Sequence, residues 1–366
     1  MPITVIAEKD LTAIPDEEVF TYTTFIPGKG TGIKLCYTTD DLNTVATKTE
    51  ESYKMANRLI DLGMPVLYAG VTDPVASVKN YDGFWKQFED KGKYNIMFIT
   101  TGVVALDASS GKTILDNAIK CAATRGDSVA IVNTYTDVVT DITTFVKSLD
   151  NTAIKRSNGV QESPLKYGAA FVPKCGSYTA AEKYLTAFAE HINQFPGWFA
   201  YAGSQRGTTK TTIAPSTQYG EIDIQTLQSK AKDDRAVNPI CNIQPYGDIV
   251  WGNRTLFPNV AKDKLVASSF LNVRLLCNIL KKRIWAACRK FTFEPNTDVL
   301  WSNFVAEIAP LLDEMKSNQG IEGYKIIRVP TNERAKVEAI IRIVPIEAVE
   351  DFDITVELSD SIEVSE

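Results

Sequence analysis

The sequence has 366 residues, with 39 Lys and Arg against 45 Asp and Glu, one His and six Cys. This length suits two or three domains and a substantial hydrophobic core. The net charge of −6 is spread along the chain, which excludes the basic footprint of a nucleic-acid-binding protein. No apolar run approaches the roughly 20 residues that span a bilayer, and the N-terminus lacks a signal-peptide pattern. We therefore expect neither nucleic-acid binding nor membrane insertion.

The cysteines are scattered and form no C-x-x-C pair. Their neighbours are mostly apolar, which is typical of buried free thiols and of folding in a reducing compartment. The six positions are Cys36, Cys121, Cys175, Cys241, Cys277 and Cys288.

Residues 1–20 are predicted to form an extended N-terminal arm. Ile3 and Val5 favour a strand, and the charged residues and Pro15 that follow interrupt any compact pattern. A short strand is predicted at 33–37.

From residue 49 onwards, helical and strand patterns alternate. Tyr53, Ala56, Leu59 and Ile60 have helical spacing, and Gly63 lies where a helix ends. Continuous apolar runs then predict buried strands, separated by helices around 84–88, 114–121 and 138–149. The predicted strands are 66–71, 94–100, 128–132 and 169–173. This alternation predicts an α/β domain with a mostly parallel sheet over residues 21–245.

From residue 203 onwards, the composition and the hydrophobic periodicity of the chain change. Residues 203–245 are rich in small and polar residues and are predicted to be loops. Amphipathic spacing then predicts helices at 262–290 and 297–317, the second kinked or shortened by Pro310. Strands at 324–329 and 337–344 complete a smaller C-terminal helix and sheet domain at 246–351. Residues 352–366 are predicted to form a terminal strand or arm.

Three partial motifs resemble parts of enzyme sites. Residues 108–113 resemble a P-loop, but Leu106 replaces its first glycine, so a helix start is the simpler interpretation. His191 is the one imidazole base, and Ser204 lies in no nucleophile elbow. Nothing in the sequence lowers the pKa of Cys175. The acidic residues Asp107, Asp116, Asp127 and Asp141 are dispersed. We therefore predict no catalytic residue, no metal or cofactor site and no enzyme activity.

A basic cluster lies near the end of the first long helix. It consists of Lys281, Lys282, Arg283, Arg289 and Lys290. The helix dipole favours cations at this end, and the alternative is a stripe that docks an acidic partner.

The two chain ends carry strand patterns. In the last predicted strand, Phe352, Ile354, Val356 and Leu358 share one face. Eight acidic residues and no basic residue lie between 343 and 366. The last strand could close the chain's own sheet. Alternatively, it could add a strand to the sheet of a neighbouring subunit, as the N-terminal segment with Ile3 and Val5 also could.

Several motifs together resemble the contractile tail sheath proteins of phages and phage-derived injection systems. The most specific is Asn238-Pro239-Ile240 followed by the W-G-x-R-T-L segment, with Trp251, Gly252, Arg254 and Thr255. The family's N-V-R-R helix start is matched at Asn272 and Arg274, although Leu275 replaces the second Arg. Its F-E-P-N … W link is matched at Glu294, Pro295 and Trp301. The resemblance covers most of residues 50–358, but the family's P-G-V-Y opening is absent.

The resemblance implies a structural subunit with a subtilisin-like α/β domain that carries no protease activity. It implies stacked hexameric rings around a tail tube, linked by exchanged strands, that contract to drive the tube through a host envelope for genome delivery. It also implies a tube protein, baseplate and terminator as partners, a place in the virion tail, and assembly in the host cytoplasm. An α/β hydrolase, a nucleotide-binding enzyme and a non-contracting ring protein are the alternatives.

Overall fold

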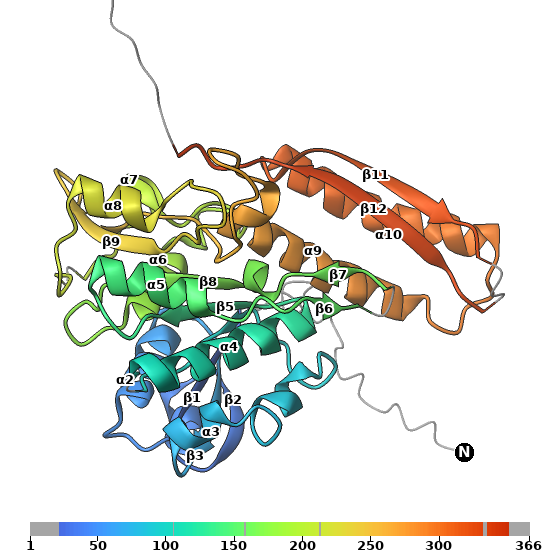
Figure 1. Cartoon of the computed structure of the whole chain (residues 1–366). Helices are drawn as coiled ribbons and strands as arrows, with labels where there is room; N and C mark the ends of the chain where they lie inside the picture. Colours follow the sequence, from blue (N-terminus) through green and yellow to red (C-terminus); the bar gives the residue numbers. More distant parts are fainter. Residues whose placement is uncertain (1–21, 105, 157–158, 212–213, 332–334, 351–366) are drawn as a thin grey trace, which may run out of the picture.

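The structure, a computed structural model, describes residues 22–350 except 105, 157–158, 212–213 and 332–334. Its centre is an eight-stranded sheet in the order β10-β9-β8-β5-β4-β1-β3-β2 (Figure 1). Six neighbouring strands from β9 to β3 are parallel, and β10 and β2 pair antiparallel at the two edges. The predicted mixed α/β fold with a mostly parallel sheet is confirmed. The strands are β1 (Thr24–Lys29), β2 (Gly32–Cys36), β3 (Val66–Val71), β4 (Phe98–Ile99), β5 (Val129–Asn133), β8 (Gly168–Val172), β9 (Asn238–Ile243) and β10 (Gly247–Val250).

Helices cover both faces of this sheet, because the strands are apolar on both sides. One face packs against α3 (Pro74–Lys79), η2 (Trp85–Glu89), α4 (Ala108–Arg125), α5 (Val139–Ser148) and α8 (Glu221–Leu227). The other face packs against α2 (Glu51–Asp61), α6 (Ala180–His191) and α9 (Leu271–Lys290). Smaller elements complete the domain: α1 (Thr39–Asn43), α7 (Gly203–Arg206), η3 (Pro164–Tyr167), η4 (Ala267–Ser269) and the hairpin β6 (Ile154–Lys155) and β7 (Gln161–Glu162).

The C-terminal unit consists of α9, α10 (Asp298–Ser317) and a long hairpin of β11 (Ile321–Val329) and β12 (Glu338–Pro345). The hairpin lies along α10, away from the central sheet (Figure 1). Tyr324, Ile326, Ile341 and Ile343 pack toward the helices, while Ile340 and Val344 face outward and are 45% and 54% exposed. Pro310 lies inside α10 without ending it.

Several element predictions were wrong. Residues 203–245 contain α7, α8 and β9 instead of loops alone, and the first long helix begins at Leu271 instead of 262. Strand β10 pairs with β9 in the central sheet, so the predicted boundary between residues 245 and 246 would divide this hairpin. The small polar residues of 203–245 concealed a buried strand because that strand is short and starts with Asn238-Pro239.

Two of the partial enzyme motifs, at residues 108–113 and at Cys175, have a clear place in the fold. Asp107 caps α4 by accepting hydrogen bonds from the Ser109 and Ser110 amides, so residues 108–113 are a helix start. Burial raises the pKa of the Cys175 thiol to about 12.

Cys36, Cys121, Cys175 and Cys241 are buried free thiols, as predicted. Cys277 is half-buried and Cys288 is exposed, contrary to the prediction. None of the described helices is both long and apolar enough to cross a membrane.

Candidate functional site

The segment 250–256 crosses from the edge of the central sheet to α9, and Asn238 holds this crossing in place. The Asn238 side chain is fully buried at the start of β9. Its Nδ2 donates to the Ala170 carbonyl at 3.1 Å and to the Arg254 carbonyl at 2.8 Å. Its Oδ1 accepts from the Arg254 amide at 2.7 Å. One amide side chain therefore satisfies both backbone groups of Arg254 and joins them to β8.

Position 252 requires a glycine because the crossing segment passes very close to β9. A Cβ atom on Gly252 would lie 2.4 Å from Gln228 Nε2 and 2.9 Å from the Asn238 Cα. Beside it, Gln228 Nε2 donates to the Trp251 carbonyl at 2.7 Å, and Trp251 N donates to the Pro239 carbonyl at 2.8 Å. The glycine thus lets two backbone segments approach each other without a side chain between them.

The next residue, Asn253, caps α9 from outside the helix. Phe270, at the N-cap position, has no side-chain oxygen, so the first amides of α9 need another acceptor. Asn253 Oδ1 accepts from the Asn272 amide at 3.1 Å, and the Asn253 carbonyl accepts from the Leu271 amide at 2.9 Å. Asn253 Nδ2 also donates to Asn272 Oδ1 at 2.8 Å. The start of α9 is therefore bound to the crossing segment.

Arg254 connects the crossing to the end of the described C-terminal chain. Its side chain is 1% exposed, and its Nε lies 2.9 Å from Glu350 Oε1. The guanidinium also lies over the Phe270 ring, 5.5 Å from its centroid. Glu350 follows β12 by five residues, so this ion pair holds the base of the C-terminal segment against the junction. Thr255 contributes a hydrogen bond from Oγ1 to the Ser268 carbonyl at 2.7 Å.

A second set of contacts fixes the middle of α9 to the α/β domain. Lys282 Nζ donates to Asp127 Oδ2 at 2.9 Å and to Asn95 Oδ1 at 2.8 Å. Arg125, which is fully buried, also contacts the Asp127 carboxylate. Burial alone would raise the pKa of Asp127, but Lys282 and Arg125 outweigh it and hold this pKa below its usual range. The carboxylate is therefore charged and joins α9 to the loop before β5.

Tyr167 lies at the centre of an unusual group of cations beside α9. The charged groups of Arg274, Arg156, Lys281 and Lys166 lie 4.3 to 5.8 Å from its ring centroid. The Tyr167 hydroxyl donates to Glu162 Oε1 at 3.0 Å. Arg274 is only 7% exposed, and its guanidinium stacks on the Tyr167 ring. This contact gives the arginine of the predicted helix-start motif a structural role.

The remaining motif residues lie further along the C-terminal unit. Glu294 and Pro295 are exposed in the turn between α9 and α10. Trp301 packs on Phe304 at 5.5 Å between ring centroids, and the Arg328 guanidinium of β11 lies 5.6 Å from the Trp301 ring centroid. This residue therefore links α10 to the hairpin.

The predicted basic cluster does not form one exposed surface. Lys282 is 5% exposed and paired with Asp127, and Lys281 Nζ donates to the Gly126 carbonyl and the Tyr167 hydroxyl. Arg283 pairs with Glu314 at 2.7 Å. Lys282 is therefore excluded from a docking surface, because its charge is satisfied inside the subunit.

Lys281 is exposed as a residue although its ammonium group contacts the α/β domain, and the other two exposed members, Arg289 and Lys290, lie at the end of α9. The Arg289 guanidinium lies 4.7 Å from the ring centroid of Trp285, which is 42% exposed. Lys290 is also exposed and pairs with Glu307. The helical periodicity of α9 places neighbouring cations on different faces, a separation that the run of letters alone conceals.

The residues proposed for strand donation, Ile3, Val5, Phe352, Ile354, Val356 and Leu358, lie outside the described residues. Within the described chain, β11 and β12 form a sheet of two strands. Each strand therefore has one edge without a partner strand among the described residues.

Sequence comparisons identify two relatives with the same name. The tail sheath protein of Vibrio phage KVP40 is 26% identical over 153 residues, and that of Enterobacteria phage T4 is 30% identical over 159 residues. Each match covers 42% of this chain and 21% of the relative, so the chain matches about a fifth of the relatives' length. No protein-family profile matches the chain.

Solved structures with the same fold come from contractile assemblies. A chain of the anti-feeding prophage baseplate in the contracted state has a TM-score of 0.69 at 13% identity, and 98% of each chain is covered. A chain of the sheath complex of an extracellular contractile injection system, also contracted, has a TM-score of 0.64 at 14% identity, with 93% of this chain and 92% of that chain covered. The resemblance to contractile tail sheath proteins is confirmed, and the relatives are named as sheath proteins and not as enzymes.

Proposed function

We propose that this chain is a structural subunit of a contractile tail sheath. The observation that carries this proposal is the β11–β12 hairpin, whose two outer edges have no partner strand within the described chain. An isolated two-stranded sheet is marginally stable, and an open edge is a template for another strand. The chain ends carry strand patterns, so the partner that we propose for these edges is a strand from a neighbouring subunit.

In the proposed assembly, each subunit donates its terminal segments to neighbouring hairpins. Phe352, Ile354, Val356 and Leu358 would place one apolar face on the acceptor, and Ile3 and Val5 would do so from the other end. Each added backbone hydrogen bond contributes about 0.5–1.5 kcal/mol net, so a strand of several residues yields a substantial link. Such links would join hexameric rings into a sheath around a tail tube.

We propose that contraction changes the packing between subunits and leaves each subunit intact. The buried contacts of Arg254, Asn272 and Lys282 favour this interpretation, because they bind the C-terminal unit firmly to the α/β domain. The segments before residue 22 and after residue 350 would act as the connections that reorient. The extended sheath would then be a metastable packing whose conversion releases free energy without a nucleotide and drives the tube through the host envelope for genome delivery.

The tube partner would meet the exposed end of α9. Arg289 and Lys290 are exposed there, and Arg283 lies nearby with Glu314. Lys281 and Lys282 are not part of this surface, because their ammonium groups contact the α/β domain. The baseplate and terminator would bind the two ends of the sheath, and the subunit would be found in the virion tail after assembly in the host cytoplasm.

Electron microscopy of the purified, concentrated protein tests the proposal. Long striated hollow tubes are the expected result, and deletion of residues 352–366 should abolish them while leaving a folded subunit. A monomer that binds ATP or reacts with a serine-hydrolase probe would instead support the enzyme alternatives. Stacked rings whose total length never changes after mixing with tube and baseplate would support the non-contracting ring protein.

A further inference from the structure

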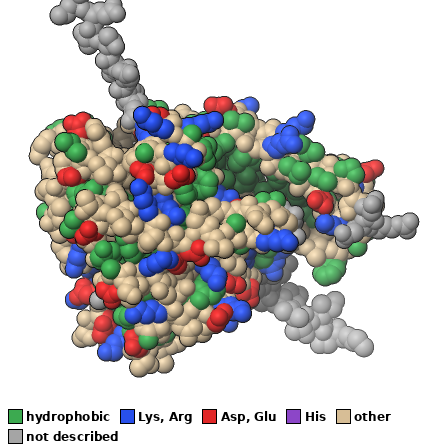
Figure 2. Space-filling view, in the orientation of Figure 1, with side chains coloured by type: hydrophobic (Ala, Val, Ile, Leu, Met, Phe, Trp, Pro, Cys, Tyr) green, Lys and Arg blue, Asp and Glu red, His purple; other side chains and the backbone are tan. Residues whose placement is uncertain are grey.

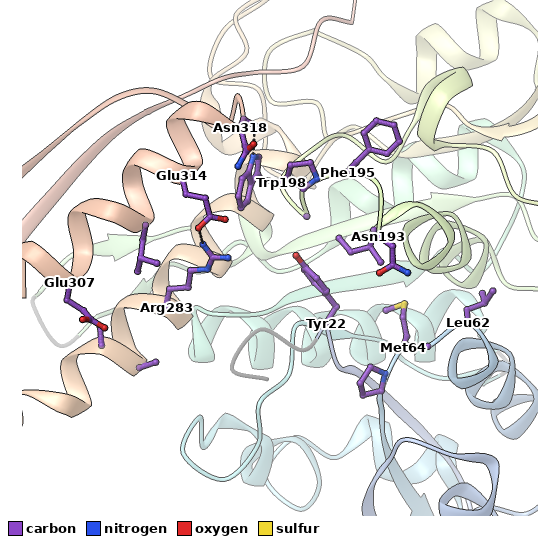
Figure 3. A pocket seen from close by; sticks show the side chains of 18 of the residues that line it. Tyr22, Leu62, Met64, Asn193, Phe195, Trp198, Arg283, Glu307, Glu314 and Asn318 are labelled. Carbon is purple, nitrogen blue, oxygen red and sulfur yellow. Dashed lines mark hydrogen bonds and ion pairs between the residues drawn. The ribbon is translucent and has the colours of Figure 1, made fainter. Parts of the chain in front are cut away.

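Helix α9 has two sides with different surroundings. One side lines a groove of about 820 Å³, opposite α10 and the loop that follows α6 (Figure 3). The residues of α9 that line this groove are Arg283, Ala286, Ala287 and Lys290. Arg274, Asn278 and Lys281 recur at intervals of four and three residues, so the helical period places them on the other side. That second side faces Tyr167 of η3.

Positive charge is concentrated around the Tyr167 ring. Lys and Arg side chains lie interspersed with Asp and Glu over the face shown in Figure 2. The group at Tyr167 has a different balance. It consists of Arg156, Lys166, Arg274 and Lys281, whose charged groups lie 4.3 to 5.8 Å from the ring centroid. Among the described residues, these four cations form ion pairs with one carboxylate, Glu162, which contacts Arg156 and Lys166. The group therefore carries an excess of positive charge.

Arg274 is the member of this group with unused hydrogen-bond donors. The residue is 7% exposed, and its Nε is buried without a hydrogen-bond partner in the described part of the chain. Stacking on Tyr167 uses the face of the guanidinium and leaves the N–H groups, which lie in its plane, available to an acceptor. Asp127 beside α9 is held by Arg125 and Lys282. Because a buried charged donor is costly without an acceptor, we expect one at this position.

Asn278, one turn further along α9, also lacks partners. Its side chain is fully buried, and neither Nδ2 nor Oδ1 has a hydrogen-bond partner among the described residues. The spacing makes it a neighbour of Arg274 and of Lys281 on the helix surface. Lys281 Nζ donates to two neutral oxygens, the Gly126 carbonyl at 2.8 Å and the Tyr167 hydroxyl at 3.2 Å. This stripe of α9 thus presents donors and positive charge without a matching anion.

We propose that this side of α9 binds a small tetrahedral oxyanion of the phosphate class between Arg274 and Lys281, beside Tyr167. An arginine presents adjacent N–H groups that match two oxygens of such an ion, and a lysine ammonium acts as a point charge on a third. The excess of positive charge favours an ion with more than one negative charge. Arg156 and Lys166 have side chains that are 21% and 17% exposed, so the opening is narrow and suits a small ion.

Calorimetric titration of the full-length, unassembled chain with inorganic phosphate tests the site. The ionic strength is held constant with chloride, and we expect saturable binding of one ion per chain. Lys281→Gln should weaken binding tenfold or more. Lys316→Gln, which removes the same charge from an exposed position on α10, is the matched control and should bind as the unsubstituted chain does. Equal weakening in both variants would show attraction by overall charge alone and would overturn the proposal.

Arg274→Gln should abolish phosphate binding. If the loss of this buried side chain prevents folding, the comparison of Lys281→Gln with its control decides the question. Absence of saturable binding to the unsubstituted chain would overturn the proposal and leave ordered water as the partner of the buried donors. Glycerol 3-phosphate, titrated in parallel, distinguishes the two sources of a phosphate group. Tighter binding of inorganic phosphate supports the free ion, and tighter binding of the ester supports a phosphorylated metabolite at the same site.

The titration of Lys281 provides a local measurement. Burial of its ammonium group and the nearby Arg274 guanidinium lower the pKa of Lys281 to about 8. An anion bound beside it favours the charged form, so sulfate should raise this pKa. Carbon-13 NMR of labelled lysine side chains, assigned with Lys281→Gln, measures the shift. An unchanged pKa at saturating sulfate would place the ion elsewhere and overturn the proposal. The site belongs to the single subunit, so failure of the sheath proposal would be recognised separately.

Discussion

Arg254 Nε lies 2.9 Å from Glu350 Oε1, which joins the crossing segment after β10 to the chain that follows β12. Nearly a hundred residues separate these two side chains in sequence. Arg254 is almost completely buried, so the Glu350 carboxylate offsets part of the cost of burying its charge. The base of the C-terminal segment is consequently part of the junction.

Glu350→Ala should lower the free energy of unfolding, because it leaves the buried Arg254 charge without this carboxylate. Loss of one partner of a buried pair costs about 3–5 kcal/mol, and the partial exposure of Glu350 places the expected loss at or below about 3 kcal/mol. Urea unfolding of the purified subunit measures it. Glu347→Ala, in the same segment, is the control and should change stability by less than about 0.5 kcal/mol. Equal effects of the two substitutions would contradict this role.

Asn238→Ala should be strongly destabilising. It removes three hydrogen bonds and leaves the Arg254 amide and carbonyl buried without their acceptor and donor. Each unsatisfied group costs about 1–3 kcal/mol. Thermal unfolding compares it with Asn242→Ala, which lies on the same strand but is exposed and bonded to Asp248. A melting temperature close to that of the control would show that the crossing does not depend on Asn238.

Because of the Asp127–Lys282 pair, the free energy of unfolding should decrease as the pH is lowered into the acid range. Because the folded pKa of Asp127 lies below its usual range, its contribution is complete above the unfolded pKa of about 3.9 and is lost as pH falls through the folded value. Asp127→Asn should therefore lower stability at pH 7 and flatten the dependence on pH below about 4. Denaturant unfolding at a series of pH values measures both effects. Asp82→Asn, at an 85%-exposed carboxylate, should retain the wild-type slope.

The basic cluster should separate into residues that hold the fold and residues that bind a partner. Lys282→Ala should destabilise the subunit, because it leaves Asp127 buried with one cation fewer. Arg289→Glu should leave unfolding unchanged and weaken association with the tube protein by tenfold or more. Calorimetry of the subunit and cosedimentation with assembled tubes distinguish the two. Tube binding unaffected by Arg289→Glu would remove this end of α9 from the proposed interface.

Much of the architecture is local and could be predicted from the sequence. The spacing of Tyr53, Ala56 and Leu59 indicated α2, and the apolar run at 66–71 indicated β3, because period and burial leave a direct pattern in neighbouring residues. The strand β9 was missed. Its outer end carries polar residues, and its role depends on pairing with β8 and β10.

The sequence by itself determined the α/β class, the two long C-terminal helices, the resemblance to sheath proteins and the absence of a recognisable catalytic motif. The tertiary structure decided which charged residues face a neighbour and which are satisfied inside the subunit. Lys282 and Arg289 are both cations of one helix, yet one pairs with Asp127 and the other is exposed. The physical reason is that a side chain's environment depends on which distant segments pack against it. Folding brings Asp127 to Lys282 of α9, and it brings Asn238 and Glu350 to Arg254 in the crossing segment.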